Sequence, residues 1–274
     1  MYPVLFRIGD FEITSFGVLV AIGALVGMWV FQRELARRSL PESGVDAGIA
    51  GVLGGLLGAK VVWSVEHAGQ EPMADLLLSR GGMSWFGGLF GGVAAGLWML
   101  RRRGVPLMAG LAAASPSLAL GHAIGRIGCF LVGDDYGRPS DLPWAVAFPE
   151  GLPPTDVPVH PTQLYETAAL LPLAWLLIQW RRGGVADRVV FGRYLILAGS
   201  IRFAIEFVRV NEPVAGPFTL AQLFSAAVTI AGIALLATKA PLKGRPTVKA
   251  PPLATKAPLK GRPTVKAPPQ GRLR

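Results

Sequence analysis

Apolar runs of about 20 residues recur along most of this chain, and they constrain its fold more than any other feature. A hydrophobic helix of this length matches the hydrocarbon core of a bilayer, which is about 30 Å thick. Because lipid offers the backbone no hydrogen-bond partners, such runs cross it as helices. The sequence predicts an all-α polytopic membrane protein with seven transmembrane helices. The expected spans are residues 13–31, 47–65, 84–100, 107–132, 164–180, 189–208 and 218–237.

Arginines gather on one side of the expected bundle. The loops after spans one, three and five carry nine arginines, whereas the opposite side carries four. By the positive-inside rule, this bias predicts an amino terminus outside and a carboxyl terminus in the cytoplasm. The first run is expected to be retained, because its positive charges follow the apolar segment, which is the reverse of a signal peptide. The nine arginines are Arg33, Arg37, Arg38, Arg101, Arg102, Arg103, Arg181, Arg182 and Arg188.

The net charge of +10 belongs to the end of the chain. Residues 238–274 hold ten Lys or Arg and no acid, while residues 1–237 balance 17 basic against 17 acidic side chains. We therefore expect a membrane domain over 1–237 and a disordered basic tail over 238–274. A 17-residue unit at 236–252 recurs at 253–269. It could adsorb to anionic lipid or be a tandem duplication with no dedicated role.

The fourth run contains an arginine where lipid is expected. Arg126 follows His122 by four residues, so both lie on one helix face. A guanidinium in hydrocarbon costs about 2.5–17 kcal/mol, so it normally faces a partner or a wet cavity. A phosphate is a fitting partner, because it accepts two hydrogen bonds from the planar group. The alternatives for Arg126 are a structural ion pair or a side chain that snorkels to the helix end, and for His122 a packing role is favoured.

A second charged pair lies in the sixth run. Arg202 and Glu206 are again four residues apart, and Arg209 continues their face. Opposite charges on one helix can neutralise each other and be purely structural. Two cationic sites, Arg126 and Arg202, that converge on one cavity would instead suit an anionic headgroup.

Polar residues flank the fourth and fifth runs on the outer side. Asp134 and Asp135 follow the fourth run and are either a solvated turn or partners that orient Arg126 or receive a proton. The segment His160–Glu166 begins the fifth run, where helix capping is favoured slightly over catalysis, with Glu166 in the first turn. His160 could accept a proton near neutral pH.

Two further features concern helix packing. Gly54 and Gly58, like Gly87 and Gly91, have the small-xxx-small spacing that lets helices approach closely. Pro116, inside the fourth run, is expected to bend or split its helix. The single cysteine, Cys129, excludes an intramolecular disulfide.

Several of these segments together resemble the prolipoprotein diacylglyceryl transferase family. The family pattern GRxGNFxNxExxGR is similar to GRIGCFLVGDDYGR at 125–138, and MSFHGGL is similar to MSWFGGL at 83–89. LPWAVAF at 142–148, HPTQLYE at 160–166 and IRFAIEFVR at 201–209 also match. The likeness covers residues 2–236 and omits the tail.

The resemblance implies a seven-span enzyme of the bacterial inner membrane. Such an enzyme moves the diacylglyceryl group of phosphatidylglycerol to the lipobox cysteine of a preprolipoprotein, the first step of lipoprotein maturation. It implies no cofactor, no metal and no nucleic-acid partner. The catalytic residues implied are Arg126, Arg202, Glu206, His160 and Asp134. The substrate-binding residues implied are Arg126, Gly137, Arg202, Gln163 and Tyr165.

The chain departs from the family pattern at polar positions. Phe86 replaces the histidine of the HGG motif, Cys129 replaces the asparagine of GNF, Asp134 shortens the acid, and Phe16 replaces a tyrosine of the first span. Either a substitute base such as His122, His160 or Asp134 acts, or the chain is a divergent paralogue that binds phospholipid with altered or no transferase activity. A transporter with an arginine-lined path is a third hypothesis.

Overall fold

The computed structural model describes residues 2–9, 11–79 and 81–238, and most of them are helical. Seven long helices in the described chain coincide with the seven expected runs, with ends moved by a few residues. Short helices η1 and α3 lie in the connections. The helices are α1 (Ser15–Arg37), η1 (Glu42–Val45), α2 (Asp46–Glu66), α3 (Met73–Leu78), α4 (Trp85–Arg102), α5 (Leu107–Val132), α6 (Thr162–Arg182), α7 (Asp187–Glu206) and α8 (Leu220–Ala237).

Four of these helical segments are long and apolar enough to cross a membrane. They are α1, the continuous stretch Glu42–Glu66, α5 and α8. Of the other three long helices, α4 and α6 each end in two arginines, and α7 contains Arg193, Arg202 and Glu206. Length and composition therefore support a polytopic membrane protein.

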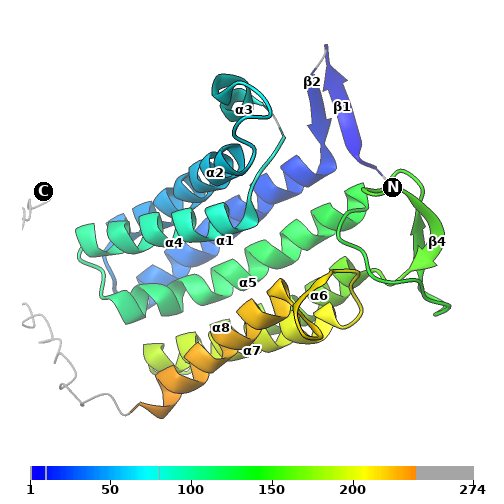
Figure 1. Ribbon diagram of the computed structural model, residues 1–274. Helices are drawn as coiled ribbons and strands as arrows, with labels where there is room; N and C mark the ends of the chain where they lie inside the picture. The colour runs from blue at the N-terminus through cyan, green and yellow to red at the C-terminus, as the bar shows by residue number, and fades with distance from the viewer. Residues whose placement is uncertain (1, 10, 80, 239–274) are drawn as a thin grey trace, which may run out of the picture. The chain divides into compact units, whose positions relative to one another are not determined.

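Three small β-hairpins correct the expectation of an all-α fold. Each is a two-stranded antiparallel sheet; the first precedes α1, and the other two lie in connections between long helices. Backbone groups in such irregular segments need partners, and a hairpin supplies them locally. The labelled hairpin strands lie at one end of the helices (Figure 1). The strands are β1 (Val4–Ile8) with β2 (Phe11–Thr14), β3 (Val146–Phe148) with β4 (Thr155–Val159), and β5 (Pro213–Ala215) with β6 (Phe218–Thr219).

The long helices pack mainly in pairs. Helix α2 packs on α4, α1 on α5, and α7 on α8, while α6 lies against α5 and α7 (Figure 1). A Cβ added at Gly54 would lie 2.8 Å from the backbone oxygen of Gly91, and one at Gly58 would collide with Gly87. The close approach predicted from the small-residue spacing is confirmed.

Helix α5 connects the two sides of the bundle. It contributes to one buried cluster with α6 and α7 and to another with α1, α2 and α4. Pro116 does not split it, because α5 is continuous from Leu107 to Val132. The second cluster lies at the turns after α1 and α4, where the α1–α5 and α2–α4 pairs meet. Its members are Phe31, Leu35, Ala47, Leu100, Val105 and Ala113.

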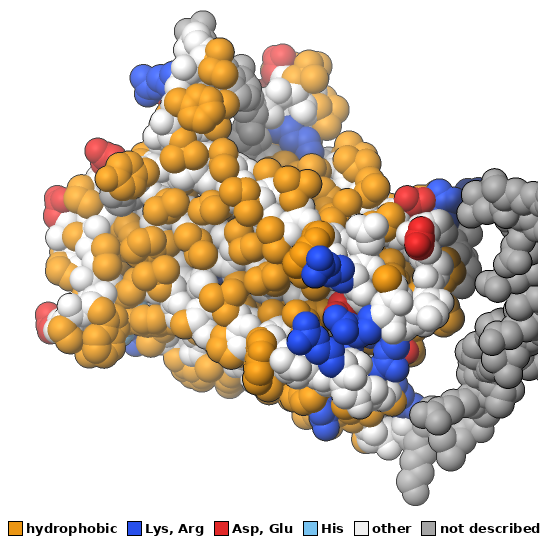
Figure 2. All heavy atoms as spheres, turned by 180° about the vertical axis from the view of Figure 1, so that it is seen from behind, with side chains coloured by type: hydrophobic (Ala, Val, Ile, Leu, Met, Phe, Trp, Pro, Cys, Tyr) orange, Lys and Arg blue, Asp and Glu red, His pale blue; other side chains and the backbone are white. Residues whose placement is uncertain are grey.

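Apolar side chains cover the outside of the helices. Leu25, Leu57, Phe90 and Ile230 are each more than 60% exposed. Figure 2 shows a broad hydrophobic face and Lys and Arg side chains gathered toward one end. At that end, guanidinium groups lie over indole rings, with Arg33 3.9 Å from the Trp29 centroid. Arg102 over Trp98 and Arg193 over Trp180 repeat this arrangement. A wide apolar surface of this kind requires a nonaqueous environment.

The predicted basic tail lies almost wholly outside the described residues, which end at Thr238. Its disorder and its repeat therefore stay predictions.

Candidate active site

The end of α5 positions the acidic pair of the predicted site. Gly133 stops the helix with φ +71°, a left-handed conformation that glycine adopts at little cost, and its N–H donates to the Cys129 carbonyl at 2.9 Å. Asp134 and Asp135 therefore emerge directly beside the last turn of α5. Arg126 lies two turns earlier on the same helix.

Arg126 is buried and pairs with carboxylates from two elements. Its Nε donates to Oε2 of Glu166 on α6 at 2.6 Å, and its Nη1 donates to Oδ2 of Asp135 at 2.8 Å. Nη1 also lies 3.4 Å from the Cys129 Sγ. The charge expected in hydrocarbon is thus compensated by two acids, as a buried guanidinium requires.

Asp135 bridges two arginines. Its Oδ1 accepts a hydrogen bond from Arg209 Nη2 at 2.6 Å, and its backbone oxygen accepts from Arg209 Nη1 and from the Thr162 hydroxyl. These contacts hold its backbone at φ +60°, a region that costs energy for residues other than glycine. Burial would raise the pKa of Asp135, but the Arg209 and Arg126 guanidiniums outweigh it and lower this pKa to about 2.

Glu206 connects the same arginines from α7. Its Oε2 accepts from Arg202 Nη1 at 2.5 Å and lies 3.5 Å from Arg209 Nε. Its Oε1 accepts from Asn211 and Thr219, both at distances under 2.8 Å. Three hydrogen-bond donors and the Arg209 charge therefore surround one buried carboxylate and fix the end of α7 against the start of α8.

These contacts form one continuous chain of alternating charge. The two arginines that the sequence singled out, Arg126 and Arg202, belong to it and are linked through Glu206, Arg209 and Asp135. They come from α5 and α7, which pack side by side. We call this set the arginine network. Its members are His122, Arg126, Asp135, Glu166, Arg202, Glu206 and Arg209.

Gln163 and Gly137 hold the outer loop in place. Gln163 donates from its amide to the Asp134 backbone oxygen. A Cβ on Gly137 would lie 2.8 Å from the His160 Cβ and would collide with the backbone of Val208. Close packing within the protein thus explains this glycine, and its predicted approach to a headgroup stays a prediction.

His160, Tyr165 and Asp134 lie around the network. His160 Nδ1 is 3.2 Å from the Tyr165 hydroxyl, which also accepts from the Trp144 indole at 2.7 Å. Oδ1 of Asp134 is buried and has no hydrogen-bond partner among the described residues. Burial raises the pKa of Asp134, and the neighbouring Asp135 charge adds to the effect.

Sequence reasoning did not choose Glu166 and Arg209 as site residues. Capping was favoured for Glu166, but α6 has no side-chain cap, and Glu166 is 1% exposed and paired with Arg126. An acid within an apolar run was the signal available, because such a residue needs a buried partner. Arg209 was noted only as a continuation of the Arg202 face.

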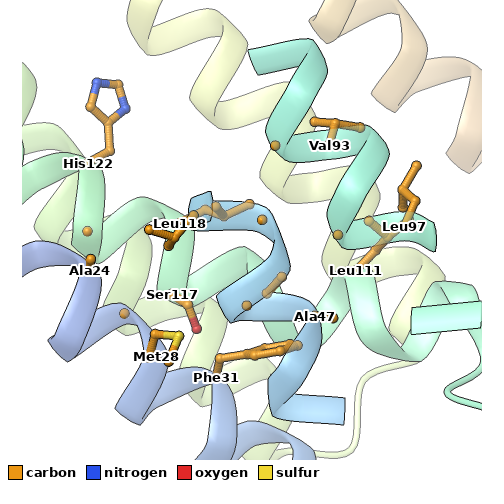
Figure 3. A pocket seen from close by; sticks show the side chains of 18 of the residues that line it. Ala24, Met28, Phe31, Ala47, Val93, Leu97, Leu111, Ser117, Leu118 and His122 are labelled. Atoms are coloured by element: carbon orange, nitrogen blue, oxygen red, sulfur yellow. The ribbon is translucent and has the colours of Figure 1, made fainter. Parts of the chain in front are cut away.

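An apolar cavity of about 500 Å³ reaches the network at His122. It opens between the α1–α5 and α2–α4 pairs and is lined largely by glycine, alanine and aliphatic side chains. Figure 3 shows the His122 ring at one end, with Leu118, Met28 and Phe31 along the wall. The His122 side chain is 50% exposed, and its Nε2 lies 3.5 Å from Glu166 Oε1. His122 thus borders the cavity and is paired with Glu166, and the packing role favoured for it stays a prediction.

Three possible metal-ligand atoms lie near one another in this site. Cys129, Asp134 and Asp135 each bring one atom within 4.8 Å of the others. Asp135, however, is already paired with two arginines, and their positive charge opposes a cation there. The arrangement favours an anionic ligand, and the absence of a metal stays an expectation.

Comparison with known proteins assigns the chain to a class of membrane transferases. The model of the family described as prolipoprotein diacylglyceryl transferase matches residues 3–238. The chain therefore belongs to this family, as the motifs predicted.

Curated relatives agree with the family assignment. A phosphatidylglycerol–prolipoprotein diacylglyceryl transferase of Geobacter sulfurreducens is 33% identical over 248 residues, which is 85% of this chain and 93% of the relative. A protein of the same name from Vibrio vulnificus strain YJ016 is 33% identical over 86% of this chain and 90% of its own length. One from Methylobacillus flagellatus is 31% identical, over 85% and 95% respectively.

Proposed function

We propose that this protein transfers the diacylglyceryl group of phosphatidylglycerol to the lipobox cysteine thiol of a prolipoprotein and releases glycerol phosphate. The observation that carries the proposal is the arginine network, which links Arg126 to Arg202 and borders an apolar cavity through His122. Membership of the family and the names of the relatives agree with it. This reaction is the first step of lipoprotein maturation.

The chemistry needs cations beside the leaving group. The thiolate attacks a glyceryl carbon, and the bond from that carbon to a phosphate oxygen breaks with its electron pair on oxygen. Donors fixed around that oxygen stabilise the charge that develops. Only Nη1 of Arg202 has a hydrogen-bond partner among the described residues, namely Glu206, and the side chain is 25% exposed. Its remaining donors can therefore bind phosphate, with Glu206 orienting the group.

We assign the other predicted residues to supporting roles. Arg126 binds the phosphate together with Arg202, while Gln163 and Tyr165 border the headgroup from the start of α6. Gly137 keeps the outer loop close to these residues. Asp134 and His160 are candidates for moving protons, since Asp134 has a buried oxygen without a partner in the described chain. The apolar cavity takes the lipid chains.

The membrane arrangement that we propose has seven spans, with the amino terminus outside and the carboxyl terminus in the cytoplasm. Helices α4, α6 and α7 then cross beside the four more apolar segments, because Arg181 and Arg202 are paired and Arg102 and Arg193 lie over indole rings. Residues 1–237 form the membrane domain and 238–274 the tail. The location is the bacterial inner membrane, where phosphatidylglycerol and preprolipoproteins are the partners.

A divergent paralogue is the second candidate, and specific residues favour it. Phe86 and Cys129 stand where the family motifs have histidine and asparagine. Phe86 packs against Phe90 and Phe224 and offers no proton acceptor. In that case the protein binds phospholipid without transferring the group.

A lipidation assay separates these functions. Purified protein is incubated with phosphatidylglycerol and a lipobox peptide, and the peptide is weighed by mass spectrometry. We expect a gain of one diacylglyceryl unit on cysteine, and none on a peptide with serine in its place. Lipid binding without product, beside an active relative as a positive control, would support the paralogue. Ion flux through liposomes that contain the protein would support a transporter.

A further inference from the structure

Glu166 holds His122 at the polar end of the cavity. Oε2 of Glu166 accepts the Arg126 hydrogen bond at 2.6 Å, and Oε1 lies 3.5 Å from His122 Nε2. Since Glu166 is almost fully buried and fixed by Arg126, it presents a defined negative charge to the ring. An N–H on Nε2 directed to this carboxylate leaves Nδ1 as a proton acceptor.

The charges that face His122 come from three helices. Glu166 lies on α6, Arg126 on α5 itself, and Arg202 on α7 acts on the ring through its charge. The α1 residues that line the cavity beside it, Gly23 and Ala24, are uncharged. One acid and two arginines therefore set the electrostatic surroundings of this histidine.

The other two histidines of the chain are placed differently. His67 stacks on Trp63, and its Nδ1 lies 2.9 Å from the Trp63 carbonyl. Nδ1 of His160 lies within hydrogen-bond distance of the Tyr165 hydroxyl. Among the described cavity-lining residues, His122 is the histidine that combines an exposed ring with a buried carboxylate partner.

We propose that His122 is the general base that deprotonates the substrate thiol, and that Glu166 orients it. The inference rests on the proposed transferase function. The thiol S–H proton passes to Nδ1 of His122, and the sulfur forms a bond to the glyceryl carbon as the carbon–oxygen bond to phosphate breaks. The proton then leaves His122 for the released phosphate monoester or for water. In this role His122 replaces the basic group lost where Phe86 stands in the HGG motif.

The first experiment compares His122→Gln with the wild type in the lipidation assay. Loss of a general base predicts a rate about 100-fold lower. His67→Gln, on α2's end and outside the network, is the matched control and keeps the wild-type rate. Thermal unfolding in detergent checks that each variant folds. A His122→Gln rate within about threefold of wild type would overturn the inference.

A peptide with selenocysteine in place of the lipobox cysteine tests the role itself. A selenol is ionised at neutral pH and needs no base, so the proposal predicts that His122→Gln modifies this peptide at nearly the wild-type rate. If His122 only shaped the site, both peptides would lose the same factor, which would overturn the inference. The wild type supplies a second measure that needs no variant: its rate should rise from pH 5.5 to 7.5 with cysteine and stay flat with selenocysteine.

Failure of the inference differs from failure of the proposed function. A wild type that modifies neither peptide removes the transferase proposal. An active wild type whose His122→Gln variant is equally active removes only the assignment of His122 as the general base.

Discussion

Two buried ionic clusters, one near each end of the helices, show how similar residues serve different purposes. The first joins α1 to α6 and α7 and consists of Glu34, Arg37, Arg181 and Asp187; we call it the α1–α6 clamp. The second is the arginine network. Each contains an arginine that bonds a buried glutamate at 2.6 Å.

The two clusters differ in what is left for a ligand. Every guanidinium nitrogen of Arg181 donates to the protein: Nε and Nη2 to Glu34 and Nη1 to Asp187. Its side chain is fully buried. In the arginine network, Nη2 of Arg126 and two nitrogens of Arg202 have no hydrogen-bond partner among the described residues. A closed cluster stabilises the fold, whereas an open one beside a cavity can bind an anion.

The largest effect should follow from removing either Arg126 or Arg202 from the arginine network. We expect Arg126→Ala and Arg202→Ala each to lower transfer by about 1,000-fold, because each removes a cation from the leaving phosphate. The readout is the lipidated fraction of a lipobox peptide over time. Arg193→Ala, on the same helix as Arg202 but packed on Trp180, is the control and should stay near wild type. Near-normal turnover in either of the first two variants would refute the phosphate assignment.

A substitution in the α1–α6 clamp should lower the free energy of unfolding and leave the transfer rate nearly unchanged. Arg181→Ala leaves Glu34 buried without its main partner, so we expect a loss of about 3–5 kcal/mol in the free energy of unfolding. Activity per folded molecule should stay within about threefold of wild type. Arg182→Ala, its exposed neighbour, should change neither quantity. Thermal unfolding in detergent and the peptide assay measure both. Wild-type stability together with slow transfer in Arg181→Ala would contradict the structural role of the clamp.

The lowered pKa of Asp135 predicts that the stability contributed by the arginine network depends on pH. Its pKa of about 2 lies below the unfolded value of about 3.9, so its stabilising effect is present above about pH 4 and is lost as pH falls through about 2. Because the side chain is 47% exposed, solvent screening reduces this contribution to about 1 kcal/mol. Asp135→Asn should cost this amount at pH 6 and flatten the decline in stability between pH 4 and 2.

The exposed Asp156 is the control for that titration. Asp156→Asn should reproduce the wild-type unfolding curve at every pH. If the free energy of unfolding depended on pH in the same way in wild type and Asp135→Asn, the bridge to Arg126 and Arg209 would contribute nothing to the pH dependence of stability.

The smallest effect is expected at Cys129. Its sulfur lies 3.4 Å from Arg126 Nη1, and a serine hydroxyl can accept the same hydrogen bond. Cys129→Ser should therefore keep the transfer rate within about threefold. A loss of 100-fold would instead make the thiol part of the reaction.

Much of the site was readable because its charges interrupt apolar runs. Arg126, Arg202 and Glu206 stood out on that ground, and the structure joins all of them in one network. Glu166 was not recognised, because its place near a helix start also suited capping. Arg181 was counted as a loop arginine that marks topology, yet it is buried against Glu34, which lies 147 residues away in sequence. A charge count cannot distinguish paired from solvated arginines.

The sequence by itself determined the long helices, the glycine faces that allow close packing and the family, because hydrophobic length, glycine spacing and motif order are local properties. Tertiary structure alone decided which arginines keep free donors and which carboxylates neutralise the rest. That choice depends on partners brought together from distant helices, as when α6 sets Glu166 between Arg126 and His122. Burial strengthens each pairing. A cluster whose donors are all paired therefore stabilises the fold, whereas one that keeps free donors can bind a ligand.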